Sequence, residues 1–223
     1  MISRFHFRCI AVVIGSLAVC SARADTPRDY YNQEARIVGG LEVVNKLHLT
    51  PGQEALRTRW YEKAFNEAGY ILNLFPNHPQ GLILLVQTCE QWKSPRCSGM
   101  DDAFQRAIEI NPNASGTYTT IGIYRHRRHQ YTEAIKSFEQ ALKLDPSSVN
   151  AQYNIGLTYF ETKQYDLANQ HAQRAYALGA PFPFLRNKLQ QVGHWKPTPT
   201  PDPQPAEASP QPPVGRQGDA VKK

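Results

Sequence analysis

The chain has 223 residues, with 25 lysines and arginines against 19 aspartates and glutamates, and 41% of its residues are hydrophobic. This length suits one domain with a real core, and the modest positive charge is unlike the concentrated basic face of a nucleic-acid-binding protein. We therefore expect no nucleic acid among its partners.

The first 24 residues have the pattern of a secretory signal peptide. Arg4 and Arg8 form a basic start, an apolar run covers Cys9 to Cys20, and Ala22-Arg23-Ala24 has the small-x-small form of a cleavage site. The run of 12 residues is shorter than the roughly 20 that a membrane-spanning helix needs. We expect cleavage after Ala24, which leaves a charge of about +3, a periplasmic or secreted protein and no transmembrane span.

Cys20 leaves a second interpretation open. A lipoprotein signal ends in a cysteine that becomes the lipidated first residue of the mature chain. Such a signal requires a small residue just before that cysteine, where this chain has Val19. Anchoring as an outer-membrane lipoprotein through Cys20 is therefore the alternative to cleavage after Ala24.

The stretch Arg36-Ile37-Val38-Gly39-Gly40 resembles the activation site of trypsin-like serine proteases. The chain lacks their nucleophile segment and a matching histidine, so we interpret the glycine pair as a helix start or kink. Motifs of metalloproteases, nucleotide-binding enzymes and α/β-hydrolases are also absent. The scattered residues His78, His171 and His194 have no acidic partner at useful spacing. We expect no enzymatic activity, no metal site and no cofactor.

Three prolines that end helical segments reveal an internal repeat. Pro76, Pro112 and Pro146 are 36 and 34 residues apart. Before each proline, and once more after the last, small or apolar residues recur at i, i+4 and i+7, which is one face of a helix. The four series are Ala64-Ala68-Ile71, Met100-Phe104-Ala107, Ala134-Phe138-Ala141 and Ala168-Ala172-Ala175.

A second helix precedes the last two series in the same way. Ile155-Gly156 lies one 34-residue period after Ile121-Gly122, and Tyr165 one period after Tyr131. The pattern resembles the tetratricopeptide repeat, a helix-turn-helix unit of about 34 residues. This resemblance implies an all-α fold, a right-handed solenoid of helical hairpins that ends in a C-terminal capping helix.

The resemblance divides an expected domain of residues 25–195. Its parts are a degenerate helix pair at 32–75, repeats at about 79–112, 115–146 and 149–180, and a capping helix at 182–193. We expect Thr50-Pro51-Gly52-Gln53 to open the second helix of the degenerate pair, because it combines an N-cap, an early proline and a capping-box glutamine. Leu185, Leu189 and Val192 form the apolar stripe of the capping helix.

Residues 196–223 form a segment of different composition. They hold 8 of the 17 prolines and no aromatic residue. Such a composition cannot bury enough apolar surface to offset chain entropy, so we expect a disordered tail. Its role, spacer or docking peptide, stays open.

Cys89 and Cys97 fall between the two helices of one pair. The repeat period places Cys89 at the end of the first helix and Cys97 just before the second, which we expect to begin near Ser98. A disulfide here closes the elbow of a helical hairpin and contributes about 2–3 kcal/mol in an oxidising compartment. A redox pair favours Cys-x-x-Cys spacing, and a zinc site needs four ligands. We interpret the pair as a structural disulfide.

The family likeness implies a concave groove lined by the first helix of each pair. The densest positive cluster, Tyr124 to His129, lies at the C-terminal end of a first helix, where the helix dipole favours cations. Alternatively, the cluster is a patch for an acidic partner, with His126 and Arg127 projecting toward the groove. Tyr153, Leu157 and Phe160 form an apolar stripe at i, i+4 and i+7. The full set of candidates is Gln87, Glu90, Gln91, Thr119, Ile123, His126, Arg127, Asn150, Tyr153, Leu157 and Phe160.

Three stretches, Phe75 to Gln80, Cys89 to Trp92 and Tyr153 to Pro181, also resemble a family of exported bacterial tetratricopeptide proteins. This likeness implies a protein of a Gram-negative envelope. We expect a non-catalytic scaffold or adaptor that binds a protein partner in the periplasm. The alternatives are a lipid-anchored assembly factor resembling the pilotins of type IV pili, and a thiol redox protein that uses Cys89 and Cys97. The sequence does not indicate the oligomeric state.

Overall fold

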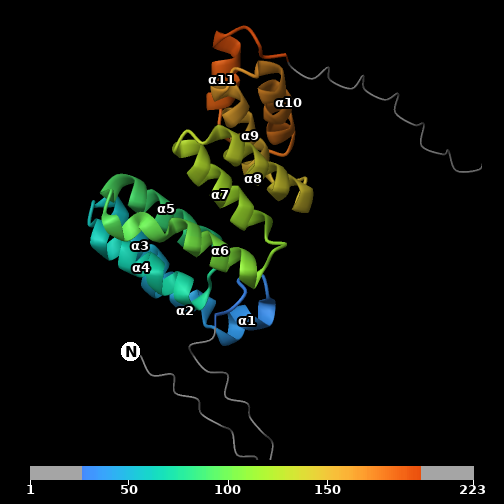
Figure 1. The fold of residues 1–223 in the computed structure, drawn as a ribbon. Helices are drawn as coiled ribbons and strands as arrows, with labels where there is room; N and C mark the ends of the chain where they lie inside the picture. The colour runs from blue at the N-terminus through green and yellow to red at the C-terminus, as the bar shows by residue number, and fades with distance from the viewer. Residues whose placement is uncertain (1–26, 197–223) are drawn as a thin grey trace, which may run out of the picture. The chain divides into compact units, whose positions relative to one another are not determined.

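The computed structural model describes residues 27–196 (Figure 1). The expected signal peptide, Cys20 and the proline-rich tail after Lys196 lie outside the described residues. Every regular element in residues 27–196 is a helix, which confirms the all-α expectation. No helix in this range is long and apolar enough to cross a membrane. The chain forms two compact units, with the boundary after Thr120, inside helix α7.

The first unit contains an N-terminal helical segment and two helix pairs. Its elements are α1 (Gln33–Val38), α2 (Leu41–Val44), the π-helical turn η1 (Asn45–Leu49), α3 (Thr50–Arg57), α4 (Tyr61–Leu74), α5 (Pro79–Trp92), the 3-10 helix η2 (Pro95–Gly99) and α6 (Met100–Ile110). The start of α7 (Ser115–Arg127) follows.

The second unit continues the same alternation. After the end of α7 come α8 (Tyr131–Leu144), α9 (Val149–Glu161), α10 (Tyr165–Ala177) and α11 (Phe184–Gln191). The pairs α5–α6, α7–α8 and α9–α10 correspond to the three expected repeats, and α11 occupies the place of the capping helix (Figure 1).

The small and apolar series found in the sequence form the seams between helices. All twelve side chains are buried, with exposed fractions of 3% or less. The seam is tightest at Gly122, where an added Cβ atom would lie 2.5–2.7 Å from three ring atoms of Phe138. Phe138 therefore packs directly on the backbone of α7, and no side chain larger than hydrogen fits at position 122.

The same turn joins the two helices of a pair at three places. In each turn one residue has a positive φ close to 60°, a left-handed conformation that ends the first helix. The amide of the next residue then donates to the carbonyl five residues earlier. The turn residues are Arg59, His129 and Lys163, and the bonds are Trp60 N to Ala55 O (2.7 Å), Gln130 N to Arg125 O (2.9 Å) and Gln164 N to Tyr159 O (2.9 Å).

This turn shows that the degenerate region holds a complete helix-turn-helix pair. Residues 41–57 form one helical run through α2, η1 and α3, and α4 is its partner. The expectation that Thr50 opens the second helix is therefore wrong, because that helix begins at Tyr61. Thr50 instead follows the π turn, and its hydroxyl donates to the carbonyl of Asn45 at 3.3 Å. The π turn accommodates Pro51, which lacks the amide hydrogen that a regular helix requires.

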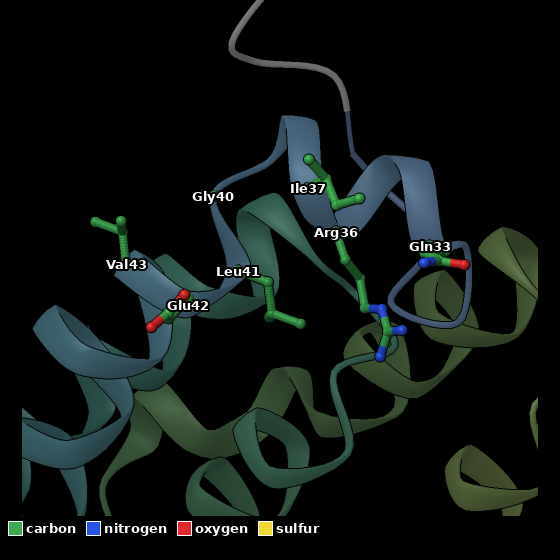
Figure 2. A pocket seen from close by; sticks show the side chains of 7 residues that line it. All are labelled: Gln33, Arg36, Ile37, Gly40, Leu41, Glu42 and Val43. Carbon is green, nitrogen blue, oxygen red and sulfur yellow. The ribbon is translucent and has the colours of Figure 1, made fainter.

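The glycine pair makes the kink between α1 and α2, as we interpreted it, and Figure 2 shows the two short helices on either side of Gly40. Gly40 has φ of 63°, and Gly39 lies so close to Phe75 that an added Cβ atom would be 2.5 Å from the ring.

Asp29 fastens the N-terminal segment to the loops after α4 and α6. Its carboxylate oxygens accept from the amides of Asn77 at 2.6 Å and Asn111 at 3.0 Å.

Candidate protein-binding face

The predicted groove residues are divided between the two units. Four of them, Gln87, Glu90, Gln91 and Thr119, belong to the first unit. Gln91 is exposed, and Gln87 and Glu90 are half-buried. Thr119 is only 7% exposed, and its hydroxyl donates to the carbonyl of Ser115 at 3.0 Å. The expectation that Thr119 presents a groove contact is therefore wrong, since its polar group bonds within its own helix.

The other seven predicted residues belong to the second unit. Arg127 and Asn150 are exposed, and Ile123, His126, Leu157 and Phe160 are half-buried. We define the α7/α9/α11 face as Ile123, His126 and Arg127 of α7, Leu157 and Phe160 of α9, and Lys188 of α11. Ile123, Leu157 and Phe160 rest against the buried core of this unit and form the apolar part of the face.

Contacts between helices hold this face together. The ring nitrogen Nδ1 of His126 lies 2.9 Å from the hydroxyl oxygen of Thr158. That hydroxyl donates to the carbonyl of Asn154 at 2.8 Å, so it accepts from the imidazole. On the other side, the ammonium group of Lys188 binds Glu161 at 3.0 Å and lies 4.9 Å above the ring of Phe160.

The charges on this face influence one another. Burial lowers the pKa of His126, the carboxylate of Glu161 opposes this effect, and Arg127 and Lys188 add to it. The imidazole is therefore biased toward its neutral form. The permanent charges here are the cations of Arg127 and Lys188 and the anion of Glu161, so the net charge favours an acidic group on a partner.

Tyr153 is not part of an open stripe, which corrects our expectation. It is 8% exposed, and the chain leading into α11 covers it. The ring of Phe182 lies 5.3 Å from the Tyr153 ring, and that of Tyr176 lies 6.4 Å away. Its burial also raises the pKa of its phenol. The apolar stripe is thus reduced to Leu157 and Phe160, because the capping segment takes its first member into the core.

Sequence reasoning did not identify the contribution of α11 to this face. Leu185 and Leu189 are fully buried, as their stripe predicted, and this burial turns Lys188 toward Phe160 and Glu161. The stripe was wrong at Val192, which is 40% exposed because the helix ends at Gln191. The repeat period carried the signal, because Lys188 lies 34 residues after Asn154 of α9. A capping helix at this spacing occupies the position that the first helix of a further repeat would have.

The side chains of the positive cluster, residues 124–129, make separate contacts in the structure and do not form one surface patch. The guanidinium groups of Arg125 and Arg128 both lie 5.5 Å from the ring centre of Tyr124, and Arg125 also donates to Gln130 at 3.1 Å. His129 forms the left-handed turn. Of this cluster, His126 and Arg127 belong to the α7/α9/α11 face.

Cys89 and Cys97 form a disulfide in the structure, with their Cα atoms 5.5 Å apart. The bond joins the last turns of α5 to η2, the 3-10 helix that takes the place of the expected helix start at Ser98. Arg96 in this loop lies 4.7 Å from the ring centre of Phe65 on α4, and its guanidinium donates to Asn66 at 2.9 Å. The disulfide thus fixes a loop that packs on the preceding helix pair.

Two histidines, the buried His78 and the half-buried His171, serve as parts of the scaffold. His78 caps α5, with its Nδ1 accepting from the amide of Gly81 at 3.1 Å. His171 lies 2.7 Å from the side-chain oxygen of Gln152 and stacks on Tyr159. Burial lowers the pKa of each to about 4. Within residues 27–196, no group of three histidine, cysteine or acidic side chains is arranged to hold a metal ion.

Comparison with known proteins agrees with this architecture. Two models of the repeat match the second unit, one described as TPR repeat over residues 125–163 and one as Tetratricopeptide repeat over residues 149–178. The curated relatives include the peroxisomal targeting signal receptor of Candida glabrata, 31% identical over 34% of this chain and 13% of the receptor. Another is the E3 ubiquitin-protein ligase CHIP of Arabidopsis thaliana, 28% identical over 40% of this chain and 32% of the ligase. The chain thus spans a third or less of these relatives.

Solved structures extend the likeness to most of the chain. PilF of Pseudomonas aeruginosa has a TM-score of 0.53 at 16% identity, covering 69% of this chain and 71% of PilF. PilW, a type IV pilus biogenesis factor, has a TM-score of 0.53 at 20% identity, covering 73% of this chain and 72% of PilW. The thermophilic TPR protein TTC0263 of Thermus thermophilus has a TM-score of 0.52 at 15% identity, covering 63% of this chain and 77% of that protein. At such identities the likeness is one of fold. The two repeat models thus identify tetratricopeptide repeats in residues 125–178, and these structures share the fold of the chain.

Proposed function

We propose that this protein is a non-catalytic interaction scaffold of the bacterial periplasm and that it binds its partner on the α7/α9/α11 face. The observation that carries the proposal is the composition of this face. Three half-buried apolar side chains, Ile123, Leu157 and Phe160, share the face with the cations of Arg127 and Lys188, and the Lys188 ammonium lies 4.9 Å above the Phe160 ring. Apolar contact area with a charged rim is the usual anatomy of a protein-binding surface.

The geometry also favours a particular partner chemistry. Leu157 and Phe160 lie on one side of α9, about one helical turn apart, and offer contacts to apolar side chains. Arg127 is exposed, and Lys188 pairs with Glu161, so an acidic group that approaches this face meets two cations. We therefore expect an extended or helical segment that carries apolar and acidic residues.

Affinity capture from envelope extract tests the proposal. The bait is the chain from Asp25 onward, compared with a Leu157→Asp/Arg127→Ala variant. The matched control is Leu167→Asp/Lys143→Ala, whose sites on α10 and α8 are likewise outside the buried core. A specific partner that binds the wild type and the control but not the face variant supports the proposal. A partner retained by all three chains overturns it, provided that circular dichroism shows each variant to be folded.

A second candidate function is assembly of a type IV pilus. It is motivated by the fold shared with PilF and PilW, two proteins similar to this chain in structure. In that case the chain would be anchored through an acylated Cys20. Mass spectrometry of the mature N-terminus separates the two candidates, since a chain that begins at Asp25 rules out the anchor and an acylated Cys20 supports it.

A further inference from the structure

The chain turns back after the capping helix α11 and returns to α10. We define the C-terminal strap as residues 193–196. It begins at Gly193, which has φ of 74°, a left-handed conformation that suits a sharp turn. The amides of His194 and Trp195 then both donate to the carbonyl of Leu189, at 2.8 and 3.1 Å. Lys196, at the end of the strap, lies against the middle of α10.

Ring contacts hold the C-terminal strap across α10. The ring of His194 lies 4.6 Å from that of Tyr165, the first residue of α10. The ring of Trp195 lies 5.8 Å from that of Tyr176, in the last turn of the same helix. The guanidinium of Arg186 lies 4.3 Å from the ring centre of Tyr176 and 5.3 Å from that of Trp195. The strap is thus fixed before the proline-rich segment begins.

Asn169 of α10 binds the backbone of Lys196 in both directions. Its side-chain oxygen accepts from the Lys196 amide at 3.2 Å, and its side-chain nitrogen donates to the Lys196 carbonyl at 3.3 Å. Gln173, one turn farther along α10, donates to the same carbonyl. Asn169 is only 7% exposed, so a nearly buried amide is committed to main-chain groups at the residue just before Pro197.

A depression rich in hydrogen-bond donors continues from this backbone contact. It has a volume of about 290 Å³ and is lined by Gln170, Gln173, Arg174 and Ala177 of α10. Gln173 belongs to both features, so the carbonyl of Lys196 already lies at the edge of the depression. Within residues 27–196 no further helix pair follows to cover this side of α10.

We propose that residues 197–201, Pro-Thr-Pro-Thr-Pro, dock on α10 over this depression. The segment begins at the bound carbonyl of Lys196 and is long enough to cover the site. Gln170 to Ala177 span about 10 Å of helix, whereas five residues in the polyproline II conformation extend about 15 Å. Because Gln173 lies between the two ends of the depression, the segment reaches either end from Lys196.

The hydrogen-bonding groups of the segment and the depression are complementary. Three of the five residues 197–201 are prolines, which lack an amide hydrogen, so the segment has five carbonyl acceptors and only the two threonine amides as donors. The side-chain amides of Gln170 and Gln173 and the guanidinium of Arg174 supply donors for these carbonyls. The prolines also restrict the chain before it docks, which reduces the entropy lost on docking.

The chain's own segment is favoured over that of a second copy. A segment joined directly to the bound Lys196 has an effective concentration in the millimolar range at the depression, which a separate chain reaches only at very high protein concentration. None of the residues in this contact belongs to the α7/α9/α11 face, so docking does not compete for the partner proposed there. The expected disordered tail then begins at Asp202 rather than at Lys196.

Nitrogen-15 relaxation tests this contact in the labelled chain from Asp25 onward. The amides of Thr198 and Thr200 report on the segment, and the amide of Ala220 is the reference within the tail. In the wild type the two threonine order parameters should approach the roughly 0.85 of rigid backbone, and in Gln170→Ala/Arg174→Ala they should fall below about 0.6. Both substituted side chains are exposed, so the variant should keep its fold, which circular dichroism checks.

The matched control is Lys136→Ala/Gln140→Ala, which changes the positions one 34-residue period earlier on α8 and should leave the threonine amides as in the wild type. Three outcomes would overturn the inference. One is a wild-type chain in which Thr198 and Thr200 are as mobile as Ala220, and another is an unchanged order of both threonines in the α10 variant. The third is order that is lost on about ten-fold dilution, because the depression would then bind the tail of a second copy.

Discussion

Acid should destabilise the first unit through one buried histidine, His78. Its side chain is 1% exposed, and its Nδ1 accepts from the amide of Gly81 at 3.1 Å. In this tautomer Nε2 carries the proton and donates to the side-chain oxygen of Asn45 at 2.9 Å. A second proton on Nδ1 would remove the acceptor that caps α5 and would place a charge in the core. Burial therefore lowers the pKa of His78 from 6.5 to about 4.

The sign and the size of the effect follow from this pKa. In the unfolded chain the imidazole has its ordinary pKa of about 6.5, so between pH 6.5 and pH 4 the unfolded state binds more protons than the folded state. The stability that neutral His78 supports is fully present above pH 6.5 and is lost as the pH falls through this window. One pKa unit is about 1.4 kcal/mol, so the loss between pH 7 and pH 5 is about 2 kcal/mol.

Urea denaturation of the wild type and of His78→Asn at pH 7 and pH 5 measures this quantity. Asparagine can still accept from the amide of Gly81, but it does not titrate. The fall in free energy of unfolding from pH 7 to pH 5 should be about 2 kcal/mol smaller in the variant. The comparison between the two chains cancels the contribution of the carboxylates. An equal pH dependence of both proteins, or an imidazole of His78 that titrates near 6.5 by NMR, would refute the reasoning.

Other substitutions test the packing. Gly122→Ala should lower the free energy of unfolding by about 1–3 kcal/mol, because the new methyl group would meet the ring of Phe138. In contrast, Gly69→Ala should raise the free energy of unfolding by about 0.5–1 kcal/mol, since no atom lies within 4 Å of an added Cβ atom. If thermal denaturation found Gly122→Ala more stable than Gly69→Ala, the close packing of Phe138 on Gly122 would be contradicted. Cys97→Ser should cost about 2–3 kcal/mol, and a disulfide reduction potential below about −300 mV would exclude the redox alternative. Asp29→Ala should cost about 1–3 kcal/mol, because a buried asparagine amide loses its acceptor, and hydrogen exchange should then accelerate in residues 27–38.

The seams of the repeat could be read from the sequence because they depend on local spacing. Residues at i, i+4 and i+7 share one helix face wherever the helix lies, and the series such as Ala134-Phe138-Ala141 are all buried. The position of the cysteine loop followed from the same period. The turn at Arg59 was present in the sequence but overlooked, since Thr58 to Tyr61 differs from Thr162 to Tyr165 at only two positions, Arg59 and Trp60.

The start of the first helix pair could not be read in this way. Thr50-Pro51-Gly52-Gln53 has the local features of a helix start, but α2 and η1 continue the helix in front of it. Packing overrides the local signal here, because Val44 and Leu49 before the proline are both 5% exposed. A helix that buries apolar residues on both sides of a proline is more stable with a π turn than with a break.

The sequence alone determined the repeat period, the helical hairpins and the residues that line their seams, because a 34-residue period and i, i+4, i+7 spacing are properties of the chain itself. Only the tertiary structure decided which side chains remain available for binding. Tyr153 and Leu157 have the same helical spacing, yet Phe182 covers the first and the second stays half-buried. Likewise, Ile37 and Val43 are exposed because no helix pair precedes them in the described residues. Exposure depends on segments distant in the sequence that pack against a face, and spacing within one helix cannot specify them.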